Sequence, residues 1–107
     1  MTKYKVIYSQ KAYRDLVNIY NYILINSLNP KIANKLIGEI KEAIESLDIL
    51  PFRHELIETS IIDFKDIRKL LVKNYIVLYR VDEVAKSVYI VRIVSCKRDY
   101  KRITETN

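Results

Sequence analysis

The sequence is poor in the residues that build disulfide-bonded and zinc-binding proteins. Its 107 residues include one cysteine, one histidine, one glycine, two prolines and no tryptophan. Cys96 alone cannot form an internal disulfide, which fits the reducing cytoplasm. One cysteine and one histidine are too few for a structural zinc site of the usual kind. We therefore expect a protein that works without a metal or another cofactor.

Two further absences concern the membrane. No apolar run approaches the roughly 18 residues that a membrane-spanning helix needs. The first ten residues, MTKYKVIYSQ, lack the apolar core and the small-residue cleavage site of a signal peptide. Half of the residues are hydrophobic and 30% are charged, as in globular proteins. We expect one cytoplasmic domain over residues 1–107 that does not enter the membrane.

The positive charge of the chain is concentrated near its C-terminus. The net charge is +6, yet residues 1–66 hold nine basic and nine acidic side chains. Residues 67–107 hold ten basic and four acidic side chains, which accounts for the whole excess. Such an asymmetry indicates a basic surface that meets nucleic acid or an acidic protein.

The N-terminal half predicts a strand followed by two helices. Residues 3–8 are rich in β-forming side chains. Ser9 can cap a first helix, because its hydroxyl can accept a backbone N–H of the first turn. Asn29-Pro30 predicts the start of a second helix, since the missing N–H of proline costs nothing at the first helical position. Apolar residues at helical spacing continue toward Pro51, where we expect this helix to stop.

The C-terminal half predicts three strands. Residues 51–66 have no clear period and are expected to form an irregular connection. Residues 67–73, 75–82 and 87–96 are apolar and β-branched, and a polar turn separates the last two segments. The element order β-α-α-β-β-β predicts an α+β fold in which a helical hairpin packs on one face of a small, mostly antiparallel sheet.

Alternation along these strands separates two faces. We expect one face to be buried under the helices, and its members are Tyr75, Val77, Tyr79, Val81, Tyr89, Val91, Ile93 and Ser95. The opposite face mixes apolar residues with Arg80, Arg92 and Arg98, and we expect it to be a partly open basic surface, because burying an unpaired arginine is too costly. Three tyrosines, Tyr75, Tyr79 and Tyr89, are expected to lie in the core. Asp15 is expected on a solvated helix face.

Several segments of the sequence resemble the RelE/ParE superfamily of toxins from type II toxin–antitoxin modules. They are S-x-x-A-x-x-D-L-x-x-I-x-x-Y-I from Ser9, N-P-x-x-A from Asn29, R-x-L-x-V-x-N-Y-x-V-x-Y-R-V-D from Arg68 and V-Y-I-V-x-I-V-x-x-K-R-D-Y from Val88. No single segment is specific, but their order and spacing cover almost the whole chain. The resemblance implies a small basic toxin of a plasmid-stabilisation module, held inactive by an acidic antitoxin.

One branch of this superfamily cleaves messenger RNA on the ribosome without a metal. The resemblance implies Lys69 and Arg98 as the catalytic candidates for that activity. Nuclease members commonly carry an arginine where this chain has Ile76, and several carry a histidine where it has Ser95 and Cys96. Tyr100 lies close to the position of a C-terminal catalytic tyrosine. The single histidine, His54, falls in the irregular connection, where an exposed loop histidine is expected.

The other branch inhibits DNA gyrase and needs no nuclease site, and the missing arginine favours this branch. The candidate target-binding residues are Arg68, Arg80, Arg92, Lys97, Arg98 and Tyr100. For Arg68 the alternative is a contact with the carbonyl groups of the sheet edge or a surface salt bridge. A third hypothesis is a basic domain that binds nucleic acid and is not toxic.

Overall fold

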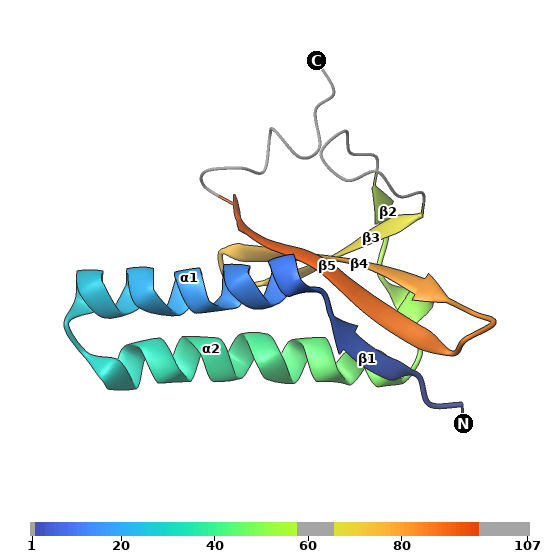
Figure 1. Cartoon of the computed structure of the whole chain (residues 1–107), viewed down its shortest axis with the longest axis horizontal. Helices are drawn as coiled ribbons and strands as arrows, with labels where there is room; N and C mark the ends of the chain where they lie inside the picture. Colours follow the sequence, from blue (N-terminus) through green and yellow to red (C-terminus); the bar gives the residue numbers. More distant parts are fainter. Residues whose placement is uncertain (1, 58–65, 97–107) are drawn as a thin grey trace, which may run out of the picture.

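The computed structural model describes residues 2–57 and 66–96, in which five strands form one sheet and both long helices lie against one face of it (Figure 1). The spatial order of the strands is β1-β5-β4-β3-β2. β1 pairs in parallel with β5, and the other neighbours are antiparallel. The predicted α+β architecture is confirmed. The elements are β1 (Lys5–Tyr8), α1 (Gln10–Ser27), α2 (Pro30–Glu45), the 3₁₀ turns η1 (Ser46–Asp48) and η2 (Pro51–Arg53), β2 (Leu56–Ile57), β3 (Ile67–Val72), β4 (Tyr75–Asp82) and β5 (Ser87–Ser95).

Both helices begin where the sequence predicted. The Ser9 hydroxyl accepts the N–H of Ala12 at 3.0 Å, and the Asn29 side chain accepts the N–H of Lys31 at 3.0 Å. Each bond satisfies a backbone donor that has no partner within the first helical turn. Leu28 ends α1 in the left-handed conformation with φ 55°, and its N–H donates to the carbonyl of Leu24. This reversal places α2 antiparallel to α1.

The second helix ends earlier than predicted. α2 stops at Glu45 and not at Pro51, and the chain continues through η1. The side chain of Arg53 donates to the carbonyls of Ser46, Ile49 and Leu50, and so satisfies acceptors that a helix end leaves open. The early stop frees the chain to turn back toward the sheet edge.

Residues 51–57 are more ordered than predicted, whereas residues 58–65 of the same expected connection lie outside the described residues. The sequence indicated an irregular connection, but the structure contains η2 and the short strand β2. β2 pairs antiparallel with β3, with Leu56 opposite Arg68 and Ile57 opposite Ile67. A strand of two residues is too short to show an alternating pattern, which explains why the sequence did not reveal it.

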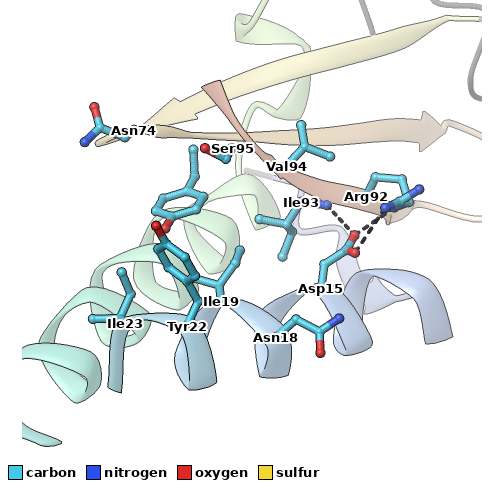
Figure 2. A pocket seen from close by; sticks show the side chains of 11 residues that line it. Asp15, Asn18, Ile19, Tyr22, Ile23, Asn74, Arg92, Ile93, Val94 and Ser95 are labelled. Carbon is cyan, nitrogen blue, oxygen red and sulfur yellow. Dashed lines mark hydrogen bonds and ion pairs between the residues drawn. The ribbon is translucent and has the colours of Figure 1, made fainter. Parts of the chain in front are cut away.

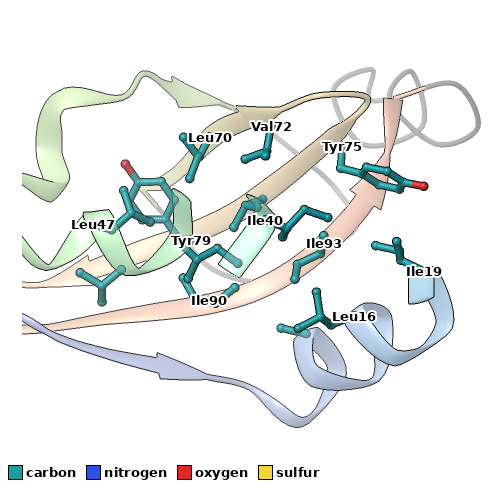
Figure 3. Close-up of a cluster of buried hydrophobic side chains, with 14 residues drawn as sticks. Leu16, Ile19, Ile40, Leu47, Leu70, Val72, Tyr75, Tyr79, Ile90 and Ile93 are labelled. Atoms are coloured by element: carbon teal, nitrogen blue, oxygen red, sulfur yellow. The ribbon is translucent and has the colours of Figure 1, made fainter. Parts of the chain in front are cut away.

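The main core lies between the helices and the sheet (Figure 3). α1 contributes Leu16 and Ile19, and α2 contributes Ile40 and Ile44. Their apolar stripes pack on a sheet face that buries Leu70, Val72, Tyr75, Val77, Tyr79, Val88, Ile90 and Ile93. The prediction that Tyr75 and Tyr79 belong to the core is confirmed. None of the helices in the described part of the chain is both long and apolar enough to cross a membrane.

A β-bulge in β5 exchanges its two faces halfway along the strand. Leu78 lies opposite Arg92, but Tyr79 lies opposite Ile90, so Val91 is an extra residue. Before the bulge Val88 and Ile90 face the helices, and after it Ile93 does. The prediction that Tyr89 and Val91 are buried under the helices is therefore wrong, and the prediction for Ile93 is confirmed.

The opposite face of the sheet has its own apolar cluster. Ile67, Ile76, Leu78 and Val94 are each less than a tenth exposed, and Val91 and Cys96 pack against them. The prediction of a partly open surface is therefore wrong for these four buried side chains, although basic residues lie beside them. In the strand register Lys69 and Arg92 lie on either side of Leu78, and each is paired with a carboxylate, Lys69 with Glu55 and Arg92 with Asp15.

Candidate functional site

Arg68 lies where β3 meets the segment that leads into β2. Its Nη1 donates to the carbonyl of His54 at 2.6 Å and to the carbonyl of Phe52 at 3.1 Å. The guanidinium carbon lies 5.1 Å from the centre of the Phe52 ring, within the range of a cation–π contact. Arg68 thus contacts carbonyl groups at the sheet edge, the alternative that the sequence left open. Both hydrogen bonds leave from one of its three nitrogens.

Lys69 is paired with an acidic residue of the same region. Its Nζ lies 3.5 Å from Oε1 of Glu55, and the Lys69 side chain is 19% exposed. The backbone N–H of Lys69 also donates to the carbonyl of Glu55. A lysine whose ammonium group faces a carboxylate is held in its charged form, which makes it a poor general base.

His54 is half-buried and not an exposed loop residue, so that expectation is wrong. Its ring meets the ring of Tyr79 edge to face, with 6.3 Å between the centres. Its Nε2 is enclosed and has no hydrogen-bond partner in the described part of the chain. Burial, with a smaller contribution from Arg53, lowers the pKa of His54 below its ordinary value of 6.5.

Tyr79 is a structural residue. It is completely buried, and its hydroxyl donates to the carbonyl of Pro51 at 2.7 Å. Burial raises the pKa of Tyr79 to about 12. A phenol with such a pKa stays protonated at neutral pH and holds the Pro51 carbonyl.

Arg80 and Tyr89 form a pair on the sheet face away from the helices. The guanidinium carbon of Arg80 lies 4.6 Å from the centre of the Tyr89 ring. The two residues are directly opposite in the β4–β5 ladder, and both are partly exposed. The prediction that Tyr89 is a core residue is wrong, because the bulge leaves it on this side.

Arg92, unlike Arg80, is bound to a helix. Its Nε and Nη2 donate to the two carboxylate oxygens of Asp15 on α1, at 2.8 and 3.1 Å (Figure 2). The same carboxylate accepts the backbone N–H of Ile93 at 2.9 Å. β1 ends at Tyr8, so no strand of the described residues pairs with this edge of β5 beyond Ile90. Its backbone groups there form hydrogen bonds with Ser9 and Asp15 instead. Asp15, predicted on a solvated helix face, is 15% exposed.

This ion pair borders a groove of about 440 Å³ between α1 and the end of β5. Isoleucine side chains from both elements form the floor of the groove (Figure 2). Polar groups of Asn18, Asn74 and Ser95 lie around it. The groove can accept an apolar side chain whose backbone meets polar groups at the rim.

The predicted site residues therefore do not form one cluster. Arg68 lies opposite Tyr79 on the helix side of the sheet, Lys69 lies opposite Leu78 on the outer side that Arg80 shares, and Arg92 is bound to Asp15. Lys97, Arg98 and Tyr100 lie outside the described residues. The sequence reasoning overlooked three partners, namely Phe52, Glu55 and Asp15. Of these only Asp15 could have been noticed in the sequence, because it belongs to the segment from Ser9 that resembles the toxin superfamily.

No group of three or more His, Cys, Asp or Glu side chains within residues 2–57 and 66–96 could hold a metal ion. The predicted basic site residues among them are engaged by carbonyls, carboxylates or aromatic rings, namely Arg68, Lys69, Arg80 and Arg92. A basic side chain that donates to such partners is not placed to accept a proton.

The fold is that of the RelE/ParE toxins. The chain superposes on a structure from the chromosomal ParDE toxin–antitoxin system of P. aeruginosa with a TM-score of 0.70, at 21% identity over 87% of this chain and 96% of that one. It also resembles the RelBE2 toxin–antitoxin complex of Mycobacterium tuberculosis, with a TM-score of 0.59, at 23% identity over 89% and 93% of the two chains.

The sequence identifies the family within this class. The model of the ParE toxin of type II toxin–antitoxin systems, parDE, matches residues 6–100. Among curated proteins, none matches the chain. Because the family model covers nearly the whole sequence, the chain belongs to the ParE toxin family.

Proposed function

We propose that this chain arrests growth in the cytoplasm by binding DNA gyrase, and that an acidic antitoxin holds it inactive. The environment of Ile76 is the observation that favours gyrase over messenger RNA as the target. This residue occupies the position where nuclease relatives carry an arginine, and it is 1% exposed within the apolar cluster of the outer sheet face. A catalytic arginine at this position would have to be exposed to the substrate, whereas this position is buried among apolar side chains.

The environments of Lys69 and His54 support the same choice of target. Cleavage of RNA at a 2′-hydroxyl requires a group that accepts its proton and a group that protonates the leaving oxygen. Lys69 is held by Glu55, and the neutral form of His54 is enclosed against Tyr79. Neither arrangement provides an accessible proton acceptor.

The proposed antitoxin follows from charge. The net charge is +6, and the excess lies in residues 67–107. An acidic chain is attracted to such a protein before contact, and complementary charges then favour the correct register. Arg68 is our candidate for a residue that target and antitoxin share, since it lies at the edge of the sheet beside the half-exposed Phe52.

The test separates the possible targets. We would induce the chain alone in a bacterial host and pulse-label DNA and protein synthesis over the following minutes. The proposal requires DNA synthesis to stop first, and the purified chain to inhibit supercoiling by gyrase. New 5′ ends in messenger RNA with an early stop of protein synthesis would refute it in favour of the nuclease, for which Arg98→Ala should then abolish cleavage. Normal growth would support the non-toxic nucleic-acid-binding alternative.

A matched pair of variants tests the role of Arg68. Arg68→Ala should weaken gyrase inhibition, whereas Arg14→Ala, which removes the same charge from an exposed position of α1, should not. Equal effects of the two variants would mean that only net charge matters and that Arg68 is not a contact.

A further inference from the structure

The segment Pro51–His54 is held to the sheet through its own backbone carbonyls. The Tyr79 hydroxyl binds the carbonyl of Pro51, and Arg68 binds the carbonyls of Phe52 and His54. On the other side Leu50 takes the left-handed conformation with φ 51°, which leucine adopts at a steric cost. The segment is therefore fixed by three hydrogen bonds against a strained entry point.

The imidazole of His54 completes this attachment by packing. Its ring lies edge to face on Tyr79, and its Nε2 is enclosed without an acceptor in the described residues. A neutral imidazole can keep its proton on Nδ1, but a charged imidazole must donate from both nitrogens. The charged form would leave an N–H of a cation buried and unsatisfied, which is costly.

The neighbouring charges also oppose protonation. Arg53 precedes His54 in the chain, and Arg68 contacts its carbonyl. The nearest carboxylate in sequence, Glu55, is paired with Lys69 at 3.5 Å. Tyr79 is uncharged, since burial raises its pKa to about 12. The groups that pack around His54 in the described residues are thus basic, paired or neutral.

We propose that Pro51–His54 is a proton-controlled latch, in which neutral His54 keeps Arg68 bound to the segment and a proton on His54 releases both. In the closed state Arg68 is bound at the sheet edge. In the open state the imidazolium moves into water, the two carbonyl bonds break, and Nη1 of Arg68, which the closed state occupies, becomes available to an acidic partner as well. The latch is a property of the toxin alone and does not depend on which target it binds.

The direction of the pH effect follows from the lowered pKa of His54. Above pH 6.5 the imidazole is neutral in both the folded and the unfolded chain, and the latch contributes its full stability. As the pH falls below 6.5, the unfolded or open form binds the proton first, and the closed form loses stability. The opening equilibrium can change by at most about tenfold per pH unit, the limit for one linked proton.

His54 is the only histidine of the chain, so its C2–H resonance can be followed without ambiguity by NMR. In a titration of the full chain from pH 8 to pH 5, we expect a midpoint below 6.5. We also expect amide exchange of residues 52–54, corrected for its intrinsic pH dependence, and the Nε–H signal of Arg68 to change with that same midpoint. A midpoint at or above 6.5, or an Arg68 signal that does not follow the titration, would overturn the proposal.

Two variants keep the proposal testable if one fails to fold. His54→Phe retains an aromatic ring on Tyr79 but cannot take a proton, so the Arg68 response should disappear between pH 8 and pH 5. His54→Gln should also remove the response, although it lacks the ring. A response that persists in either folded variant shows that another group drives the opening, and it would exclude the latch. Because none of these measurements uses gyrase, they succeed or fail independently of the proposed target.

Discussion

Replacing Asp15 with alanine should destabilise the fold by about 2–3 kcal/mol. The carboxylate accepts two hydrogen bonds from Arg92 and one from the N–H of Ile93. Breaking a fully buried ion pair costs about 3–5 kcal/mol. The exposed fractions here, 15% for Asp15 and 30% for Arg92, reduce that value through solvent screening. The unpaired N–H of Ile93 adds about 1 kcal/mol or more.

Urea unfolding followed by circular dichroism measures this loss directly, and the thermal midpoint should fall by roughly 10–15 °C for a domain of this size. Asp15→Asn retains the shape and one acceptor oxygen, so it should cost about half as much. Glu42→Ala, on an exposed position of α2, is the matched control and should change stability by less than about 0.5 kcal/mol.

A double-mutant cycle that combines Asp15→Ala with Arg92→Met measures the interaction energy between the two side chains. We expect the two substitutions to couple by about 1 kcal/mol or more, as residues in one hydrogen-bonded network do. The amide of Ile93 should also exchange faster in Asp15→Ala than in Arg92→Met, because only the first variant removes its acceptor. Additive energies, or an unchanged Ile93 amide, would show that the carboxylate does not secure this edge.

Four further predictions follow from single positions. Gly38→Ala should raise the unfolding free energy by about 1 kcal/mol, because a Cβ there meets no atom within 4 Å; a lower urea midpoint would contradict this. Leu28→Gly should stabilise the chain by about 0.5–1 kcal/mol in the same assay, since φ 55° suits glycine and the side chain is 85% exposed. Tyr79→Phe should cost about 1–2 kcal/mol by leaving the Pro51 carbonyl unpaired, and equal urea midpoints would refute that bond. Ile76→Arg should destabilise the fold by more than about 2 kcal/mol without conferring RNA cleavage, which a ribosome-dependent cleavage assay on the folded fraction checks.

The sequence predicted those parts of the fold that depend on local chemistry. The side chains of Ser9 and Asn29 cap the helices by accepting an N–H two or three residues further on, so their effect can be predicted without knowing the tertiary structure. The strand segments were also recognisable from their composition. The antiparallel order of β3, β4 and β5 then followed from short connections.

The sequence did not reveal features that depend on partners far away in the chain. The extra residue Val91 reverses the alternation of β5, and nothing within the strand marks it, because Tyr89, Val91 and Ile93 are all suitable for burial. Asp15 has the sequence surroundings of an ordinary surface acid, and its partner Arg92 is 77 residues further along the chain. The candidate site was predicted as one basic surface for the same reason, since alternation alone could not show that Arg92 turns to the helix and Arg80 away from it.

The pairing of β1 with β5 has a consequence for the timing of folding. The first strand has its neighbour in residues 87–90, and Ser9 and Asp15 bind partners 82 and 77 positions further on. Contacts between such distant positions slow folding, because a long loop must close before they form. During synthesis at about 5–20 residues per second, the growing chain spends seconds with its N-terminal strand unpaired. The native sheet, and with it any toxicity that requires it, can arise only when almost the whole chain has been made.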